Sequence, residues 1–176
     1  MLPLEGRFEA HDIAADGLVF RDDRVRVTAS ENTHYHFAHG SAAYGKDKAY
    51  SYRFDTADRS VIFTGDTGPS EELAKLADGA DVLVSEVVDV DAMIKFMVET
   101  MHMPEKAQAA MRFHIEQEHL PPEEVGKLAA KAHVKAVVLT HLSPGLDAET
   151  DASRYTDGVR KYFSGTVIAG RDFLEF

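Results

Sequence analysis

The stretch SVIFTGDTGPS, residues 60–70, decides the fold of this chain. Its first four residues are a short apolar run typical of a buried strand, and the residues that follow it have the composition of a helix. The turn between them is bounded by two glycines and holds Asp66 at the end of the strand. A carboxylate in that position is costly unless it is paired, and a metal ion is a usual partner. The alternative is that Asp66 serves only to cap the helix. Ser70 is the better N-cap, however, so we interpret Asp66 as a functional residue.

The remainder of the chain alternates strand-like and helix-like segments, which indicates an α/β layered fold. Strands are expected at about residues 17–20, 25–29, 49–54, 60–64, 81–87, 134–139, 166–170 and 173–176. Helices are expected at about residues 70–78, 91–101, 104–118, 122–132 and 148–163. Residues 30–48 are the long irregular segment, and long ordered loops in compact domains are often functional.

The composition is that of an ordinary globular chain, and its length predicts a single domain over residues 1–176. Hydrophobic residues make up 44% and charged residues 28%, and no apolar run is long enough for a membrane helix. The net charge is −11 without a basic stripe, which argues against nucleic-acid binding by this chain alone. No signal peptide is recognisable and cysteine is absent, so we expect a cytoplasmic location.

With nine histidines and no cysteine, any metal site in this chain must be built from imidazoles and carboxylates. Asp66 ends one expected strand and His141 ends another. The carboxyl ends of strands are where sites collect in α/β sheets, so we expect these two side chains to meet. An Asp with a His suits Zn²⁺, with Mn²⁺ or Fe²⁺ as alternatives. His141 can also be a turn histidine that only bonds to the backbone.

The other histidines differ in how well their positions suit a site. His34 follows the second expected strand and is the third candidate ligand, although it can also be an exposed loop histidine. His36 and His39, in the same loop, are weaker candidates. His119 follows a helix, and it either interacts with the helix dipole or reaches into the site. We interpret the remaining four as structural or surface residues: His11, His102, His114 and His133.

Four motifs, taken together, resemble the C-terminal half of a metallo-β-lactamase-fold hydrolase. They are FTGDTGPS at residues 63–70, GADVLVSE at 79–86, HLPPEEVG at 119–126 and VLTHLSPG at 138–145. Each motif is weak alone, but all four occur in the family's order and are most similar to the branch that contains tRNase Z and arylsulfatase-like enzymes. The resemblance implies part of an αββα sandwich, with a mixed β-sheet and flanking helices.

The resemblance also implies a site that holds two divalent metal ions. Asp66 matches the carboxylate that bridges the two ions, His34 a ligand of the first ion and His141 a ligand of the second. His119 matches a histidine that assists the leaving group or stabilises charge on the substrate, and Glu86 matches a supporting acid. The implied reaction is attack by a metal-activated water on a phosphodiester, sulfate ester or lactone-type ester of a small molecule.

One part of the family pattern is missing from this sequence. The family has a His-x-His-x-Asp-His motif before the middle histidine, and residues 34–39, HYHFAH, have its spacing. Ala38 replaces the Asp, however, and the chain from His39 to Asp66 is too short for the elements that should intervene. We therefore keep His34 as the middle histidine and expect the N-terminal half of the family's domain to be lacking.

This missing motif leaves two hypotheses for the function. In the first, the chain belongs to a metal-dependent hydrolase, and the remaining ligands come from a homo-oligomer or from the missing N-terminal half. In the second, the chain is a non-catalytic α/β scaffold that dimerises through its exposed sheet. Both hypotheses predict a close partner, because half of a sandwich leaves an apolar sheet face open to water.

Overall fold

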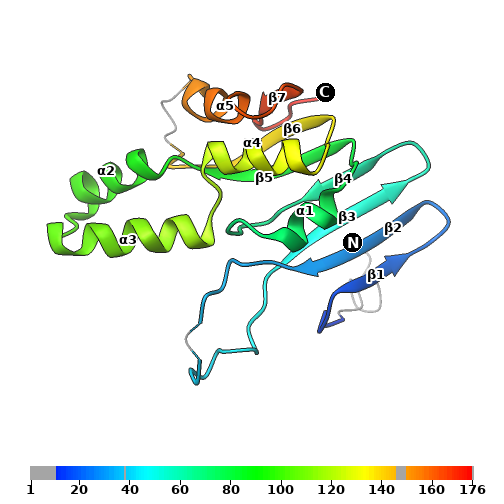
Figure 1. The fold of residues 1–176 in the computed structure, drawn as a ribbon, viewed down its shortest axis with the longest axis horizontal. Helices are drawn as coiled ribbons and strands as arrows, with labels where there is room; N and C mark the ends of the chain where they lie inside the picture. The colour runs from blue at the N-terminus through cyan, green and yellow to red at the C-terminus, as the bar shows by residue number, and fades with distance from the viewer. Residues whose placement is uncertain (1–10, 38, 146–149, 176) are drawn as a thin grey trace, which may run out of the picture.

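The computed structural model describes residues 11–37, 39–145 and 150–175. Within them, seven strands form one mixed sheet whose spatial order, β1 to β7, follows the chain (Figure 1). The strands up to β4 pair antiparallel, and those from β4 to β7 pair parallel. The strands are β1 Gly17–Arg21, β2 Val25–Glu31, β3 Tyr50–Thr56, β4 Ser60–Phe63, β5 Val82–Val88, β6 Ala136–Ser143 and β7 Thr166–Ala169.

The helices lie between the parallel strands, because a parallel pair needs a crossover connection. They are α1 Glu71–Ala77, α2 Val90–Met101, α3 Glu105–Glu118, α4 Pro122–Lys131 and α5 Ser153–Arg160. Ser70 caps α1 as expected, since its side-chain oxygen accepts a hydrogen bond of 3.0 Å from the amide of Leu73. The predicted α/β fold, a mixed sheet with flanking helices, is confirmed. None of the described helices is both long and apolar enough to cross a membrane.

The main core lies between one face of the sheet and the helices α1, α4 and α5. Ile62, Leu83 and Val137 project from three adjacent strands onto this face and are completely buried. Leu73 of α1 and Val125 of α4 pack into the same cluster. This layer fixes the direction of β4, β5 and β6, whose carboxyl ends carry the candidate site.

The opposite face of the sheet is apolar and partly open among the described residues. Side chains alternate between the two faces of a strand, so the neighbours of the core residues point to this side. Phe63 is 44% exposed and Phe20 is 52% exposed. The rings of Phe54 and Phe63 meet edge to face with centroids 5.5 Å apart. The face therefore has the character of a surface that another layer can cover.

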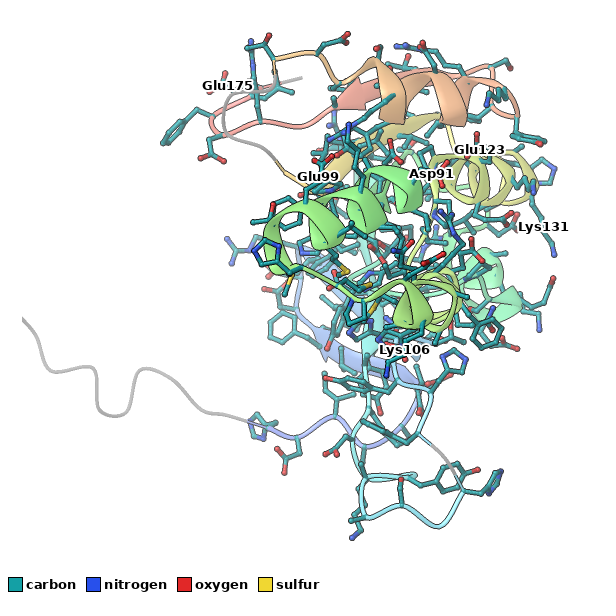
Figure 2. The ribbon with its side chains drawn as sticks, turned by 90° about the vertical axis from the view of Figure 1, so that its left-hand side faces the viewer. Asp91, Glu99, Lys106, Glu123, Lys131 and Glu175 are labelled. Carbon is teal, nitrogen blue, oxygen red and sulfur yellow. The ribbon has the colours of Figure 1, made fainter. Side chains whose placement is uncertain are left out.

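Helices α2 and α3 form a hairpin beyond the carboxyl end of β5, at the end of the sheet where the β2–β3 loop also projects (Figure 1). The hairpin has a small core of its own around Ile94 and Ile115, with methionine sulfur atoms between the helices (Figure 2). Asp89 caps α2 by accepting a hydrogen bond of 2.9 Å from the amide of Ala92. The hairpin returns the chain to the sheet at His119.

Three expected elements differ from the structure. Strand β6 continues to Ser143, so His141 lies inside it; a bulge in the pairing with β5 accommodates this residue, whose φ is 45°. Helix α5 begins at Ser153, whose amide donates a hydrogen bond to Asp151, and ends at Arg160 rather than at residue 163. The expected start at residue 148 lies outside the described residues. Residues 173–175 form a turn and coil rather than a strand, because Phe173 has a φ of 61°.

Candidate metal centre

The candidate site lies at the carboxyl ends of β2, β4, β5 and β6, which all point to the same edge of the sheet. His34 comes three residues after β2, and Asp66 comes three residues after β4. Glu86 lies within β5 and His141 within β6. The chain therefore brings together four titratable side chains that lie far apart in the sequence, as the topology of an α/β sheet favours.

Two groups of metal-competent side chains share one carboxylate. His34, Asp66 and His119 each place a ligand atom within 4.8 Å of the others. Asp66, Glu86 and His141 do the same on the other side. Asp66 is common to both groups, which is the position that a carboxylate bridging two ions must occupy. The sequence-predicted residues Asp66, His34, His119 and His141 are thus brought together in the structure.

His34 is oriented by two hydrogen bonds that leave one ring nitrogen for a ligand. Its Nδ1 lies 3.2 Å from the backbone oxygen of Glu118, which can only accept, so Nδ1 carries the proton. Nε2 is then the unprotonated nitrogen, the form in which an imidazole binds a metal. The backbone amide of His34 donates to Asn32 Oδ1 over 3.1 Å.

Asn32 holds the His34 segment against the end of β4, a role that sequence reasoning missed. The side chain is only 8% exposed, and its Nδ2 lies 3.2 Å from the carbonyl oxygen of Thr64 and 3.3 Å from Ser51 Oγ. The next residue, Thr33, donates its amide to Thr67 Oγ1 over 3.3 Å. The sequence signal for this role is an Asn two residues before a candidate ligand, because Asn side chains often bond to the backbone two residues on.

Glu86 is buried, with 1% of its surface exposed, and its carboxylate has two hydrogen-bonding partners. It accepts the amide of Thr67 over 2.7 Å and lies 2.9 Å from His119 Nδ1. The hydrogen bond to Glu86 raises the pKa of His119 above its ordinary value, although burial of the imidazole opposes this shift. Nδ1 is therefore the nitrogen that donates to Glu86, and Nε2 of His119 is left to face a substrate or an ion.

The loop after β4 and the end of α3 are packed backbone against backbone. A Cβ atom at Gly68 would lie 1.9 Å from the carbonyl oxygen of Gln117, so only glycine fits there. Gly65, on the other side of Asp66, has a φ of 58°, which also favours glycine. The two glycines noted in the sequence thus differ in role. Gly65 allows the chain to turn, and Gly68 leaves room for the C-terminal end of α3, which His119 directly follows.

His141 approaches the shared carboxylate from β6. Its Nδ1 lies 3.4 Å from Asp66 Oδ1, and both side chains are partly open to solvent. A cation can therefore reach this pair without a rearrangement of the core. The other described histidines are exposed and lie outside both groups: His11, His36, His39, His102, His114 and His133.

Comparison with known proteins places the chain in a superfamily. Residues 2–142 match the family model described as "Beta-lactamase superfamily domain". The chain belongs to the metallo-β-lactamase-fold superfamily. It is 30% identical over 116 residues to a ribonuclease Z of Archaeoglobus fulgidus. The matched segment covers 66% of this chain and 31% of that protein. This member of the superfamily therefore spans about a third of the length of the curated relatives that it matches.

Solved structures of other proteins share the fold of this chain. Human tRNase Z, short form, superposes with a TM-score of 0.53 at 20% identity, over 92% of this chain and 45% of that one. Zn²⁺-bound PqqB from Methylobacterium extorquens gives a TM-score of 0.59 at 14% identity, over 93% of this chain and 55% of that one. At these identities the likeness is one of fold, and it agrees with the expected mixed sheet and flanking helices.

Proposed function

We propose that this chain provides the metal-binding part of a metal-dependent hydrolase that acts on a phosphodiester, sulfate ester or lactone-type ester. The observation that carries this proposal is the position of Asp66, which belongs to both groups of metal-competent side chains. Membership of the metallo-β-lactamase superfamily and the ribonuclease Z relatives support it. The substrate class is kept broad because one fold hosts many reactions.

The donor set fits divalent ions that accept nitrogen and oxygen ligands. His34 with its proton on Nδ1, the Asp66 carboxylate and His141 suit Zn²⁺, and they also suit Mn²⁺ or Fe²⁺. Bound ions would supply a hydroxide from a coordinated water and stabilise the charge that develops on the substrate. Asp66 would hold both ions, and the Glu118 carbonyl would keep the His34 ring in place.

His119 has the arrangement of a proton donor to the leaving oxygen. Glu86 accepts from Nδ1 of His119 and raises the pKa of the imidazole, so the ring keeps a proton at higher pH than a free histidine. Nε2 can then hold that proton toward the substrate beside Asp66 and His34. Because Glu86 also accepts the Thr67 amide, the acid is fixed and the direction of the imidazole is set.

The ligands that complete each ion would come from a further segment of protein or from a second copy of this chain. The apolar sheet face around Phe63 supports such a partner, because large open apolar patches mark interaction surfaces. The same face also supports the alternative hypothesis, a non-catalytic scaffold that dimerises. Metal binding separates the two, since the scaffold hypothesis requires no bound ion.

Elemental analysis of Asp66→Ala tests the metal site directly. Purified chain, incubated with Zn²⁺ or Mn²⁺ and then desalted, should retain metal, whereas Asp66→Ala should lose most of it from both positions. Asp58→Ala, which changes an exposed acid in the β3–β4 turn, is the matched control and should bind like the wild type. Retention of metal by Asp66→Ala would contradict the shared role of this carboxylate. Acidification should also release the metal, because protons compete with the ion for the imidazole nitrogens.

Hydrolysis is then measured on a phosphodiester, a sulfate ester and a lactone with the metal-loaded chain. We expect Asp66→Ala to abolish any activity while its circular dichroism stays that of the wild type. An active Asp66→Ala variant would overturn the proposal.

A further inference from the structure

His141 is held in a backbone conformation that a histidine rarely adopts. Its φ of 45° lies in the left-handed region, where the Cβ atom of an L-residue crowds the following carbonyl oxygen. The pairing of β6 with β5 skips one residue between Glu86 and Val87, and that residue is His141. Such a bulge often turns a side chain to a new direction beside an active site. Here it turns a candidate ligand, whose Nδ1 lies 3.4 Å from Asp66 Oδ1.

A conformation of this kind persists only where the surrounding contacts fix it. Before the bulge, β6 lies between β5 and β7, but within the described part of the chain β7 pairs with it only as far as Leu139. After the bulge, the strand neighbour that the structure describes is β5, which pairs with Leu142 and Ser143. This pairing is short, so contacts beyond Ser143 matter for the direction in which His141 points.

Arg154 of α5 binds the chain directly after these two residues. Its Nη2 donates to the carbonyl oxygen of Pro144 over 2.9 Å. The hydroxyl of Tyr155, a residue that is 2% exposed, donates to the same oxygen over 3.1 Å. Arg154 Nη2 also lies 2.7 Å from that hydroxyl, and the guanidinium lies over the Tyr155 ring, 4.6 Å from its centroid. One carbonyl group, three residues after His141, is thus held by two side chains of one helix.

The same guanidinium faces the junction between β5 and α2. Arg154 Nε lies 4.0 Å from Asp89 Oδ2, and each of these side chains is 25% exposed. The backbone amide of Asp89 donates to the carbonyl oxygen of Ser143 over 2.8 Å. These contacts tie the end of the strand that carries His141 to the end of the strand that carries Glu86. Both of these residues belong to the same metal-competent group, so the contacts bear on how that group is assembled.

We propose that Arg154 is a positioning residue for the metal centre, which holds the chain after His141 so that the bend at this residue directs its imidazole toward Asp66. The proposal rests on the proposed function, because it explains how one of the ligands is kept in place. Arginine suits this role, since its planar guanidinium presents several donors in a fixed arrangement, whereas a lysine ammonium is a point charge on a flexible stem. Loss of a supporting contact of this kind typically weakens metal binding about 10–100-fold.

Nuclear magnetic resonance of the metal-free chain tests the conformation of His141 without requiring an ion. The Cα and Cβ chemical shifts of His141 and its amide-to-Hα coupling report the φ of this residue. We expect Arg154→Met, which keeps an apolar stem but has no donor, to move these values toward those of an ordinary strand. Arg154→Lys can still donate to Pro144 and should give values closer to those of the wild type. Unchanged values in Arg154→Met would overturn the proposal.

Titration with Zn²⁺ then measures the effect on the metal centre. We expect Arg154→Met to bind Zn²⁺ about 10–100-fold more weakly than the wild type. Tyr155→Phe keeps the buried ring but removes one donor to Pro144, so it should weaken binding by a smaller factor. This second variant decides the question if Arg154→Met does not fold. Wild-type affinity in every folded variant would contradict the positioning role.

Arg160→Met is the matched control for a general loss of stability. Arg160 lies at the other end of α5 and also holds a strand carbonyl, since its Nη2 donates to the oxygen of Val167 over 3.2 Å. We expect Arg160→Met to lower the melting temperature, while the chemical shifts of His141 and the Zn²⁺ affinity stay at wild-type values. An equal loss of Zn²⁺ affinity in Arg160→Met would assign the effect to stability and overturn the positioning role.

The two proposals can fail separately, because the measurement on the metal-free chain does not depend on an ion. If the chain retains no metal but Arg154→Met changes the φ of His141, the hydrolase is overturned and the hold on His141 is supported. If the chain retains metal and Arg154→Met changes neither the φ of His141 nor the Zn²⁺ affinity, only the positioning role is overturned.

Discussion

His119 is held by a single buried acid, and this makes its role separable from metal binding. We expect His119→Ala to lower kcat by roughly 10²–10⁴-fold, the usual contribution of a general acid. Metal content should not change, because Asp66 and His34 remain in place. The measurement pairs steady-state kinetics of the metal-loaded protein with elemental analysis. His114→Ala removes an exposed imidazole from helix α3, which ends directly before His119, and should change neither quantity.

The opposite outcome for His119 has an equally clear meaning. Loss of metal from His119→Ala would make this residue a ligand, which its membership of the first metal-competent group permits. Glu86→Gln distinguishes the two roles further. The neutral side chain keeps its size but should lower the pKa of His119, because the hydrogen bond to the charged carboxylate is the main cause of its raised value.

At the scale of single residues, the candidate ligands were predictable from the sequence, but the residues that hold them in position were not. Asp66 and His141 follow apolar runs, and motif order locates His119, so the sequence indicates each of them. Asn32 and Thr67 act through hydrogen bonds to segments that lie far away in the chain. Nothing in their local sequence shows these partners, because the contacts exist only after the strands have paired.

At the scale of elements, the contact of the β4–α1 loop with α3 fixes the position of His119. Gly68→Ala should lower the free energy of unfolding by about 1–3 kcal/mol, because the new methyl group would overlap the Gln117 carbonyl. It should also weaken metal binding or turnover, since the end of α3 must move. Denaturant unfolding and metal titration measure the two effects.

Gly79→Ala is the matched control for the Gly68 prediction. Gly79 has a φ of 66° and nothing within 4 Å of its Cβ position, so alanine there strains the backbone without touching the site. We expect it to destabilise the chain while metal affinity and turnover stay at wild-type values. If both variants behaved alike, the loop contact would be merely structural.

Most elements were predictable because their periodicity and caps are local. Strand β5 and helices α2 to α4 were expected within about two residues of the observed bounds. Strand β6 was predicted too short, because its extension to Ser143 depends on a bulge opposite β5. The turn at Phe173 replaced a predicted strand, because a positive φ at a phenylalanine has no local sequence signal.

At the scale of the whole molecule, the open sheet face should control association. We expect the wild-type chain to self-associate with rising concentration, and Phe63→Glu to reduce this by placing a charge on the apolar face. Analytical ultracentrifugation measures the effect. Phe173→Glu, which changes a fully exposed ring outside the sheet, is the control. A wild-type chain that stays monomeric at all concentrations would leave no role for a second copy at this face.

The order of the strands has a consequence for how the chain acquires its site during synthesis. Because neighbours in the sheet are also neighbours in the sequence, each strand can pair with the one made just before it. Such local pairing avoids a large entropy cost of loop closure. The site does not share this order: His34 leaves the ribosome early, while His141 emerges only after most of β6 has been made. The sheet can therefore grow progressively on the ribosome, and the two metal-competent groups are completed in order: the first when His119 is in place, the second only after β6 has paired.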